Sequence, residues 1–373
     1  MGGRMHLGLF MMPVHPAGRL LADTLAEDTE KSLLAEKLGF AEVWVGEHFS
    51  ATTEPIPSPM MFMAGLVPQT KRLRFGTAVV NVPNHDPVIV AAEAAQLDHM
   101  SRGRFMLGVG PGGLVSDFEL FGVTDHAARV RRVTEAVDLI QYIWGNDPPY
   151  RFEGEFRKVR LEEAIIPELG IGTMPKAFQP GGPPISISLA SPNSSSAALA
   201  AERGWGMISA NIIPTHSVGS HWKVYSEACS RLGKRASGET WRVARNICVA
   251  PTDAQAKERV FGEAGSNRYF FNYMRTVLGR VGLLSILKPD PEMADEKATV
   301  EAITEGCVLY GSPATVLDKL VAFRETVGPF GTLLMTGLDW GGVNEAWERQ
   351  SMQLLAEQVM PKLRQHIEAR AEV

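Results

Sequence analysis

Polar residues gather directly after the short apolar segments of this chain, which is where α/β proteins place catalytic and binding groups. Glu47 and His48 follow an apolar segment that ends at Val45. A carboxylate beside an imidazole suits proton transfer or the binding of a polar heterocycle, because both groups hold and exchange protons. A surface turn uses the same residue types, so the spacing alone leaves both interpretations open.

Small residues stand at the ends of the next two apolar segments. Thr77 and Ala78 would let a flat ligand approach the backbone, although ordinary strand packing accounts for them by spacing alone. Residues 108–113 match the dinucleotide-binding pattern G-x-G-x-x-G. That pattern should turn directly into a helix, whereas the next helix is expected near His126, and Pro111 removes an N–H group. A glycine-rich loop pressed against a ligand plane is the better interpretation.

Two further segments could bind an anion. Arg129 lies in the first turns of a predicted helix, where its guanidinium could pair with a phosphate. Arg131 and Arg132 follow, and because residues two and three apart diverge on a helix, at most one of the three should face a site. A solvated basic stretch is the alternative. Residues 190–196 carry four serines and an asparagine before a helix, more polar groups than a cap requires, which suits phosphate binding.

Other kinds of site lack the residues that they need. The nine histidines form no H-E-x-x-H pattern and no close cluster with cysteine, so no metal is expected. A hydrolase triad has no G-x-S-x-G turn to support it. The three cysteines, Cys229, Cys248 and Cys307, are odd in number and far apart, so we expect no disulfide framework and a cytoplasmic protein.

Composition excludes several kinds of partner. The chain has 373 residues, of which 45% are hydrophobic and 21% charged, with 37 basic against 42 acidic residues and a formal net charge of -5. Such a balance lacks the basic patch of a nucleic-acid-binding protein. No apolar run reaches the roughly 18 to 20 residues that span a bilayer, and the N-terminal residues do not read as a signal peptide.

Short apolar segments alternate with longer segments of helical periodicity along the chain. Alternation of this kind implies parallel strands joined by right-handed crossovers. About eight units favour a closed (β/α)8 barrel over an open sheet, with the active site at the C-terminal ends of the strands. The predicted strands are residues 6–12, 41–45, 73–81, 104–109, 185–189, 205–210, 241–250 and 332–336.

Two segments interrupt this alternation. Residues 145–184 are rich in Gly and Pro with a hairpin-like stretch at 150–160, and residues 265–305 are helical but irregular. The length would allow two or three domains or one elaborated barrel. We predict a single domain over residues 1–373, in which both segments are insertions that determine the choice of substrate.

The segments at the strand ends together resemble the bacterial luciferase-like flavin-dependent monooxygenases. The resemblance covers most of the chain and looks closest to the limonene- and alkane-monooxygenase-like group. It rests on the segments LGFAEVWVGEHF (38–49), RFGTAVVNVPNHDP (74–87), LDHMSRGRFMLGVGPG (97–112), SDFELFGVTDHAARV (116–130) and GTLLMTGLDWG (331–341). The resemblance implies a TIM barrel, reduced FMN as cofactor and a separate NAD(P)H:flavin reductase.

The resemblance also implies roles for individual residues. Glu47 matches a flavin-pocket residue, and His48 is the expected catalytic residue. Ala78 and Val79 match a pair joined by a non-proline cis peptide that packs on the flavin ring. The phosphate is expected at Arg129 and the strand-five loop, in which the cofactor-binding residues are Ala190, Ser191, Asn193, Ser194 and Ser196.

One loop departs from the luciferase pattern. Gly110 and Pro111, also expected at the cofactor, stand where the luciferase α subunit has a cysteine and an arginine. The change removes one phosphate contact and argues against light emission. The glycine and proline are instead similar to the limonene-type group.

The activity that the resemblance implies is a two-component monooxygenase. A flavin C4a-hydroperoxide would transfer one oxygen atom to an apolar substrate such as a terpene, ketone, aldehyde or alkane. An F420-dependent oxidoreductase of the same fold and a non-catalytic flavin-binding protein are the alternatives. A Rossmann dehydrogenase is a more distant one. Family members usually form homodimers, which we also expect here.

Overall fold

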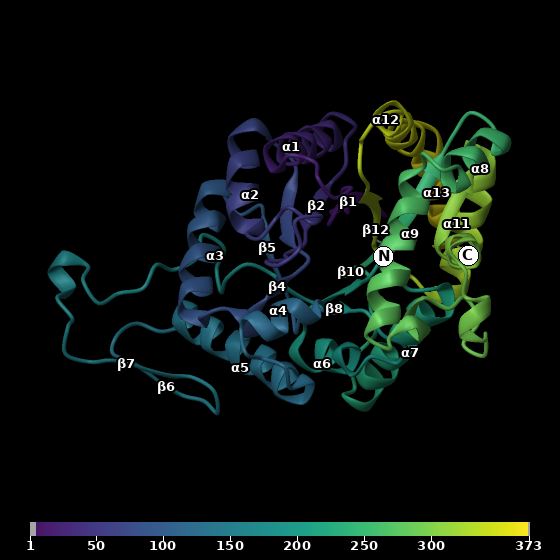
Figure 1. Cartoon of the computed structure of the whole chain (residues 1–373). Coiled ribbons are helices and arrows are strands. Elements are labelled where there is room, and N and C mark those ends of the chain that lie inside the picture. The colour runs from purple at the N-terminus through teal and green to yellow at the C-terminus, as the bar shows by residue number, and fades with distance from the viewer. Residues whose placement is uncertain (1–4, 372–373) are drawn as a thin grey trace. The chain divides into compact units, whose positions relative to one another are not determined.

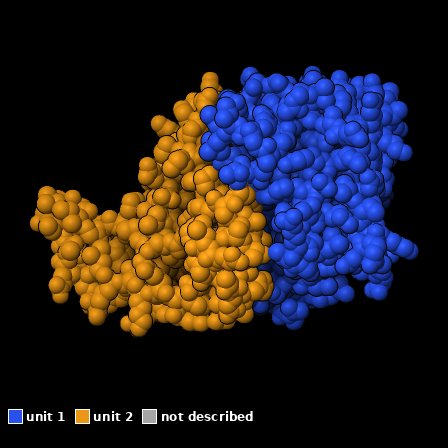
Figure 2. All heavy atoms as spheres, in the orientation of Figure 1, with its two compact units in different colours: residues 1–44, 52–55, 187–373 blue, residues 45–51, 56–186 orange. Residues whose placement is uncertain are grey.

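The computed structural model describes residues 5–371 and contains two compact units. Unit 1 comprises residues 1–44, 52–55 and 187–373, and unit 2 comprises residues 45–51 and 56–186; Figure 2 shows them in different colours. That the chain is one domain over residues 1–373 stays a prediction.

Eight parallel strands alternate with helices along the chain (Figure 1). In sheet order they are β1 (His6–Met11), β2 (Glu42–Val45), β3 (Arg74–Thr77), β5 (Phe105–Gly110), β8 (Ile185–Leu189), β9 (Gly206–Ser209), β10 (Trp241–Val249) and β12 (Thr332–Gly337). The sheet closes because β12 pairs in parallel with β1, from His6 opposite Thr332 to Met11 opposite Gly337. The predicted (β/α)8 barrel is therefore confirmed.

The barrel strands are apolar because helices cover them. Strands β2, β5, β10 and β12 are buried over their whole length. Parallel strands with both faces covered have this near-continuous apolar pattern, which is why short runs of Val, Ile, Leu and Met identified them in the sequence.

Side-chain caps mark the starts of several helices. Asp86 caps helix α3 by accepting the N–H of Val88, Thr252 caps α8 and Ser312 caps α11, as their residue types indicate. The α-helices are α1 (Leu21–Lys37), α2 (Pro59–Leu66), α3 (Pro87–Ser101), α4 (Val115–Leu120), α5 (His126–Gly145), α6 (Ser195–Arg203), α7 (Thr215–Arg231), α8 (Asp253–Phe261), α9 (Ser266–Arg280), α10 (Val300–Cys307), α11 (Pro313–Val327), α12 (Asn344–Leu354) and α13 (Met360–Ala371).

Some elements differ from the expectation. The sequence did not predict helix α4 or strand β11 (Val308–Gly311), because neither is long enough to show a periodicity. The predicted strand 73–81 is divided into β3 and a short β4 (Val80–Asn81), which pairs with β5. A π-helical turn at Leu355–Val359 interrupts the long C-terminal helix between α12 and α13.

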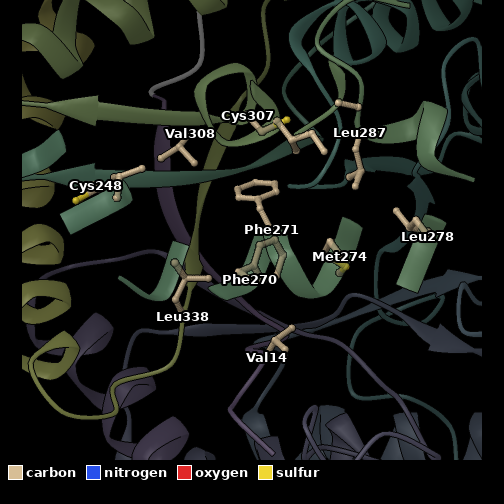
Figure 3. Close-up of a cluster of buried hydrophobic side chains, with 13 residues drawn as sticks. Val14, Cys248, Phe270, Phe271, Met274, Leu278, Leu287, Cys307, Val308 and Leu338 are labelled. Carbon is tan, nitrogen blue, oxygen red and sulfur yellow. The ribbon is translucent and has the colours of Figure 1, made fainter. Parts of the chain in front are cut away.

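In unit 1, residues 265–305 carry part of the apolar core. Phe270, Phe271, Met274 and Leu278 of α9 belong to a buried cluster with Val14, Cys248, Leu287, Cys307, Val308 and Leu338 (Figure 3). Val14 and Leu338 follow β1 and β12, so α9 packs beside the C-terminal ends of those strands. Burial of these apolar side chains stabilises the packing of α9 in unit 1.

In unit 2, residues 145–184 contain an antiparallel hairpin. Strands β6 (Tyr150–Glu153) and β7 (Lys158–Leu161) pair with Tyr150 opposite Leu161, close to the predicted position. The carboxylate of Glu135 on α5 accepts the backbone N–H groups of Phe156 and Arg157 in the turn. The hairpin is thereby held against α5.

No helix among the described residues has the length and apolar character needed to cross a membrane.

Candidate active site

Glu47 is locked in place just after β2, within unit 2. Glu47 as a whole is 3% exposed. One carboxylate oxygen accepts the backbone N–H of Asn81 at 3.1 Å, and both oxygens lie 3.0 Å from Nε2 of His85. The side-chain amide of Asn81 in turn donates to the backbone oxygen of Glu47 at 3.0 Å. These contacts fix the direction of the carboxylate.

His48 is oriented by an acidic residue that the sequence did not single out. Its Nδ1 lies 3.4 Å from a carboxylate oxygen of Asp117 on α4. Asp117 also accepts the N–H groups of Phe49 at 3.2 Å and Ser50 at 2.9 Å. Since an ionised carboxylate can only accept, Nδ1 of His48 is the donor of this contact.

The pKa of Asp117 reflects these contacts. Burial alone would raise the pKa of the carboxyl group, but hydrogen bonds from His48, from the Ser50 side chain and from the backbone lower it from 3.8 to about 2. Asp117 is therefore ionised at neutral pH and is a constant negative partner for His48.

The peptide bond between Ala78 and Val79 is cis, as the resemblance predicts. The N–H of Ala78 donates to the backbone oxygen of Val45 at 2.7 Å, next to the Glu47 segment. Thr77 is also fixed, because its hydroxyl donates to the backbone oxygen of Gly108 at 2.7 Å and accepts the N–H of Gly108 at 2.8 Å. The ends of β3 and β5 are thus tied together.

The glycine-rich loop after β5 has a steric requirement for glycine. Gly110 ends the strand and Pro111 follows it. Gly112 has φ +84°, and a Cβ atom there would lie 2.9 Å from a ring carbon of Phe118 and 3.5 Å from Cγ of Asn81. The loop reaches α4 only at Val115, so it does not turn directly into a helix as a dinucleotide-binding loop does.

Arg129 is buried, and one of its hydrogen-bond donors, Nε, has no partner among the described residues. Arg129 is 5% exposed, and one terminal nitrogen, Nη1, donates to the backbone oxygens of Val123 and Thr124 at 2.9 and 2.8 Å. The other terminal nitrogen, Nη2, lies 3.3 Å from Nδ1 of His126. Its guanidinium lies 3.5 Å above the Phe118 ring, and its buried Nε has no partner among the described residues. Burial lowers the pKa of Arg129, but a guanidinium stays charged at neutral pH. A buried donor without a partner is costly, which suits a place where an anion binds.

Arg131 and Arg132 take other directions, as the helical spacing predicts. Arg131 is exposed and pairs with Glu155 at 3.0 Å. Arg132 lies 4.3 Å above the ring of Phe156. Arg129 is therefore the buried residue of the three.

Asn81, Gly112, Phe118 and Arg129 form one continuous set of contacts in unit 2. Asn81 contacts Glu47 at one end, a Cβ atom on Gly112 would meet both Phe118 and Asn81, and the Arg129 guanidinium lies above the Phe118 ring. Helix α4 contributes both Phe118 and the partner of His48, Asp117. The short helix thus links the two predicted parts of the site, the Glu-His pair and the arginine.

The serine loop, residues 190–196, belongs to unit 1. Ala190, Ser191 and Asn193 are exposed, and Ser194 precedes α6 without a side-chain hydrogen bond to the helix. Ser196 lies in the first turn of α6. The loop backbone is anchored, because the N–H of Asn193 donates to the Ser220 hydroxyl at 2.8 Å and the oxygen of Ser191 lies 2.9 Å from Nε2 of His221. Capping therefore does not occupy the Ser194 hydroxyl.

His221 is a structural residue beneath this loop. Burial lowers its pKa from 6.5 to about 4, although its bond to Ser191 opposes the change. The ring is thus neutral at physiological pH, and its Nδ1 lies 2.9 Å from the Ser209 hydroxyl.

A charged cluster lies at the ends of β1 and β12 in unit 1. Ligand atoms of His15, Glu27 and Asp28 lie within 4.8 Å of one another, a spacing that a metal would also need. Two cations already meet these acids, since Lys31 is 3.1 Å from Asp28 and Arg19 is 2.7 Å from Glu27. The acids are therefore neutralised within the protein.

Sequence reasoning missed three residues of the site: Asn81, His85 and Asp117. Asn81 and His85 lay inside the segment 74–87, and Asp117 inside 116–130, both of which carried the resemblance. The signal was present, but spacing could not show which of these side chains meet Glu47 and His48.

The fold and these contacts define a class of protein, a (β/α)8 barrel enzyme with its polar groups at the C-terminal strand ends. The model of the luciferase-like monooxygenase family matches residues 5–328. The chain therefore belongs to that family.

Individual relatives agree with this assignment. The chain is 31% identical to 4-hydroxyprotoasukamycin monooxygenase of Streptomyces nodosus subsp. asukaensis, over 96% of this chain and 92% of the relative. It is 28% identical to limonene 1,2-monooxygenase of Rhodococcus erythropolis, over 96% of this chain and 87% of that relative. A solved structure, the oxygenating constituent of 3,6-diketocamphane monooxygenase of Pseudomonas putida in complex with FMN, matches with a TM-score of 0.86 at 27% identity, over 96% of this chain and 99% of that one.

Proposed function

We propose that this protein is the oxygenase component of a two-component monooxygenase that uses reduced FMN and O2. Its substrate is a small apolar organic molecule, of the terpene, ketone, aldehyde or alkane type. Membership of the family and likeness to oxygenases that act on limonene and diketocamphane support the reaction class. A separate NAD(P)H:flavin reductase supplies the cofactor.

The observation that carries the proposal is the buried Nε of Arg129. It is a charged donor without a partner, connected through Phe118, Gly112 and Asn81 to the locked Glu47. An aromatic cofactor with a phosphate fits this donor set, because the guanidinium offers a charge-assisted hydrogen bond and Gly112 leaves the loop without a side chain.

Each residue then has one physical task. When bound, reduced FMN supplies the chemistry that activates O2 and transfers one oxygen atom. Glu47 would hold polar atoms at the edge of the flavin, and His48 would hold or move a proton while Asp117 keeps Nδ1 protonated. Ala78, Val79, Gly110 and Pro111 would hold the flavin ring. Arg129 would bind the phosphate. The further cofactor-binding residues that the resemblance implies are in the serine loop: Ala190, Ser191, Asn193, Ser194 and Ser196.

We also propose that the protein is a homodimer and lies in the cytoplasm. Met61 on α2 is 77% exposed and Ile89 on α3 is 55% exposed, so these helices offer apolar surface to a second copy. The three cysteines are free and buried, which suits the cytoplasm. We expect sedimentation of the purified protein to show a dimer. A monomer would contradict the proposed homodimer.

The test is a binding and turnover assay with the full chain. We expect the purified protein to bind FMN and, with reduced FMN and O2, to add one 18O atom from 18O2 to members of a panel of terpenes, ketones, long-chain aldehydes and alkanes. Binding of F420 in place of FMN would instead indicate a hydride-transfer enzyme. Tight FMN binding without oxygenation of any panel member would indicate a flavin-binding protein.

A further inference from the structure

His85 lies between the buried Glu47 and a cavity on the outer side of the strand end. The side chain of Glu47 is 1% exposed, whereas that of His85 is 23% exposed. Nε2 of His85 lies 3.0 Å from both carboxylate oxygens, so the imidazole meets the carboxylate symmetrically. The ring of Phe49 packs beside it, with 5.5 Å between the ring centroids.

The cavity has a volume of about 290 Å3 and a polar lining. The imidazole of His85 lines the cavity together with four charged residues, Asp86, Arg132, Glu135 and Arg157. Arg157 pairs with Asp86, and Glu135 accepts two backbone N–H groups, so the lining holds its own charges in balance. A cavity of this size and polarity holds several water molecules.

The hairpin insertion builds one wall of this cavity. Phe156 and Arg157 belong to the turn between β6 and β7, and Arg132 stacks on Phe156. Val82, Pro83 and Pro87 form the wall on the side of the strand end. The insertion therefore encloses the outer face of His85.

The Glu47 carboxylate is buried, so it does not exchange protons directly with bulk solvent. Its carboxylate partners are a backbone N–H, which does not exchange protons on the time scale of turnover, and an imidazole, which does. A proton that moves between Glu47 and the cavity therefore has to pass through His85.

We propose that His85 is a positioning residue that connects Glu47 with the cavity and carries protons between them. The N–H at Nε2 gives its proton to the Glu47 carboxylate while Nδ1 takes a proton from a cavity water, which leaves as hydroxide to bulk solvent. In the reverse sequence Nε2 takes the proton back from Glu47 and Nδ1 returns one to hydroxide, forming water. One proton enters and one leaves the imidazole, so charge and atoms balance. This inference rests on the proposed function, in which Glu47 faces the cofactor.

The experiment separates proton transfer from mere support. His85→Gln can still donate an N–H to Glu47 but cannot titrate, and His85→Ala removes both properties. His99→Gln is the matched control, because His99 is an exposed histidine on α3 whose Nε2 lies 3.0 Å from the backbone oxygen of Lys176. FMN affinity is measured by flavin fluorescence and turnover over a range of pH.

The expected results differ between the variants. His85→Gln keeps the Kd for FMN within about twofold but lowers kcat about 10 to 100-fold, as loss of a proton-transfer group does. His85→Ala is also slow, and added imidazole, which fits the enlarged cavity, restores part of its kcat. His99→Gln resembles the wild type. Turnover of His85→Gln equal to that of the wild type, or a slow His85→Ala that imidazole does not restore, would overturn the proposal.

A second measurement uses the protein without cofactor. In protein labelled with 15N-histidine, Glu47→Gln should move the side-chain Nε2 resonance of His85 and leave that of His99 in place. An unmoved His85 signal would show that the two groups are not coupled. Absence of FMN binding in the wild type would refute the proposed function itself, whereas normal wild-type binding with fast His85→Gln turnover would refute only the proton path.

Discussion

Nδ1 of His48 lies 3.4 Å from a carboxylate oxygen of Asp117, a residue 69 positions further along the chain. This contact joins the segment after β2 to the short helix α4. An ionised carboxylate at Nδ1 selects the tautomer of the ring and stabilises its protonated form. The arrangement fixes the orientation of the His48 ring.

We expect His48→Ala to retain FMN and to lose productive oxygen transfer. The ring's proton chemistry disappears, while the contacts of Arg129 and Glu47 remain. The Kd for FMN should stay within about threefold of the wild type, and consumed O2 should be released mainly as H2O2, with product formation lower by about 100-fold. Parallel assays of O2 uptake, H2O2 and product check this, and coupling equal to that of the wild type would remove His48 from the mechanism.

We expect Asp117→Asn to lower stability at neutral pH by about 1 to 3 kcal/mol, because donors that now meet a carboxylate lose a charged acceptor. The native pKa of about 2 is below the ordinary 3.8, so the stabilisation is present above about pH 4 and is lost as the pH falls toward 2. Urea unfolding at a series of pH values should show the gap between wild type and variant closing in that window. Glu119→Gln, an exposed change on the same helix, is the control, and a pH-independent gap would contradict the linkage.

We expect Arg129→Ala to weaken FMN binding by about 1.5 to 3 kcal/mol, or roughly 10 to 150-fold in Kd, as for a charge-assisted hydrogen bond. Riboflavin, which lacks the phosphate, should bind both forms equally. Arg131→Ala is the control, since that guanidinium is exposed and pairs with Glu155. An unchanged Kd for FMN in Arg129→Ala would exclude the phosphate role.

We expect Gly112→Ala to destabilise the protein by about 1 to 2 kcal/mol, because alanine is strained at positive φ and its Cβ would press on Phe118. Displacement of Phe118 should also loosen Arg129 and weaken FMN binding. Gly113→Ala is the control, since a Cβ there meets no atom within 4 Å. Equal unfolding midpoints for the two variants would show that the loop adapts without strain.

We expect the cluster at His15 to lose stability in alkaline solution. Burial opposes the charge on His15, but hydrogen bonds to Asp28 and Asp339 outweigh it and raise its pKa above 6.5. The stabilisation is therefore fully present below about pH 6.5 and is lost as the pH rises through the raised native value. The difference in unfolding free energy between wild type and His15→Gln, measured from about pH 5.5 to 9, should shrink with rising pH; a constant difference would contradict the assignment.

The sequence by itself determined the barrel and the location of the candidate site. Strands buried on both faces have continuous apolar runs, and the polar residues that follow them must lie at one end of the barrel, so Glu47, His48 and Gly112 could be placed without a structure. Helix caps such as Asp86 were also predictable, because a cap is a local interaction.

Only the tertiary structure decided which side chains meet. Helix α4 is too short for a periodic signal, yet it supplies Asp117 to His48 and Phe118 to Arg129. In the sequence, His85 resembles an ordinary loop residue; only the structure shows that it contacts Glu47, 38 positions earlier. Spacing reports the direction of a side chain within one element, whereas contacts between elements depend on how strands, loops and helices pack. The sequence therefore specified the groups of the site, and the fold specified their partners and hence their protonation.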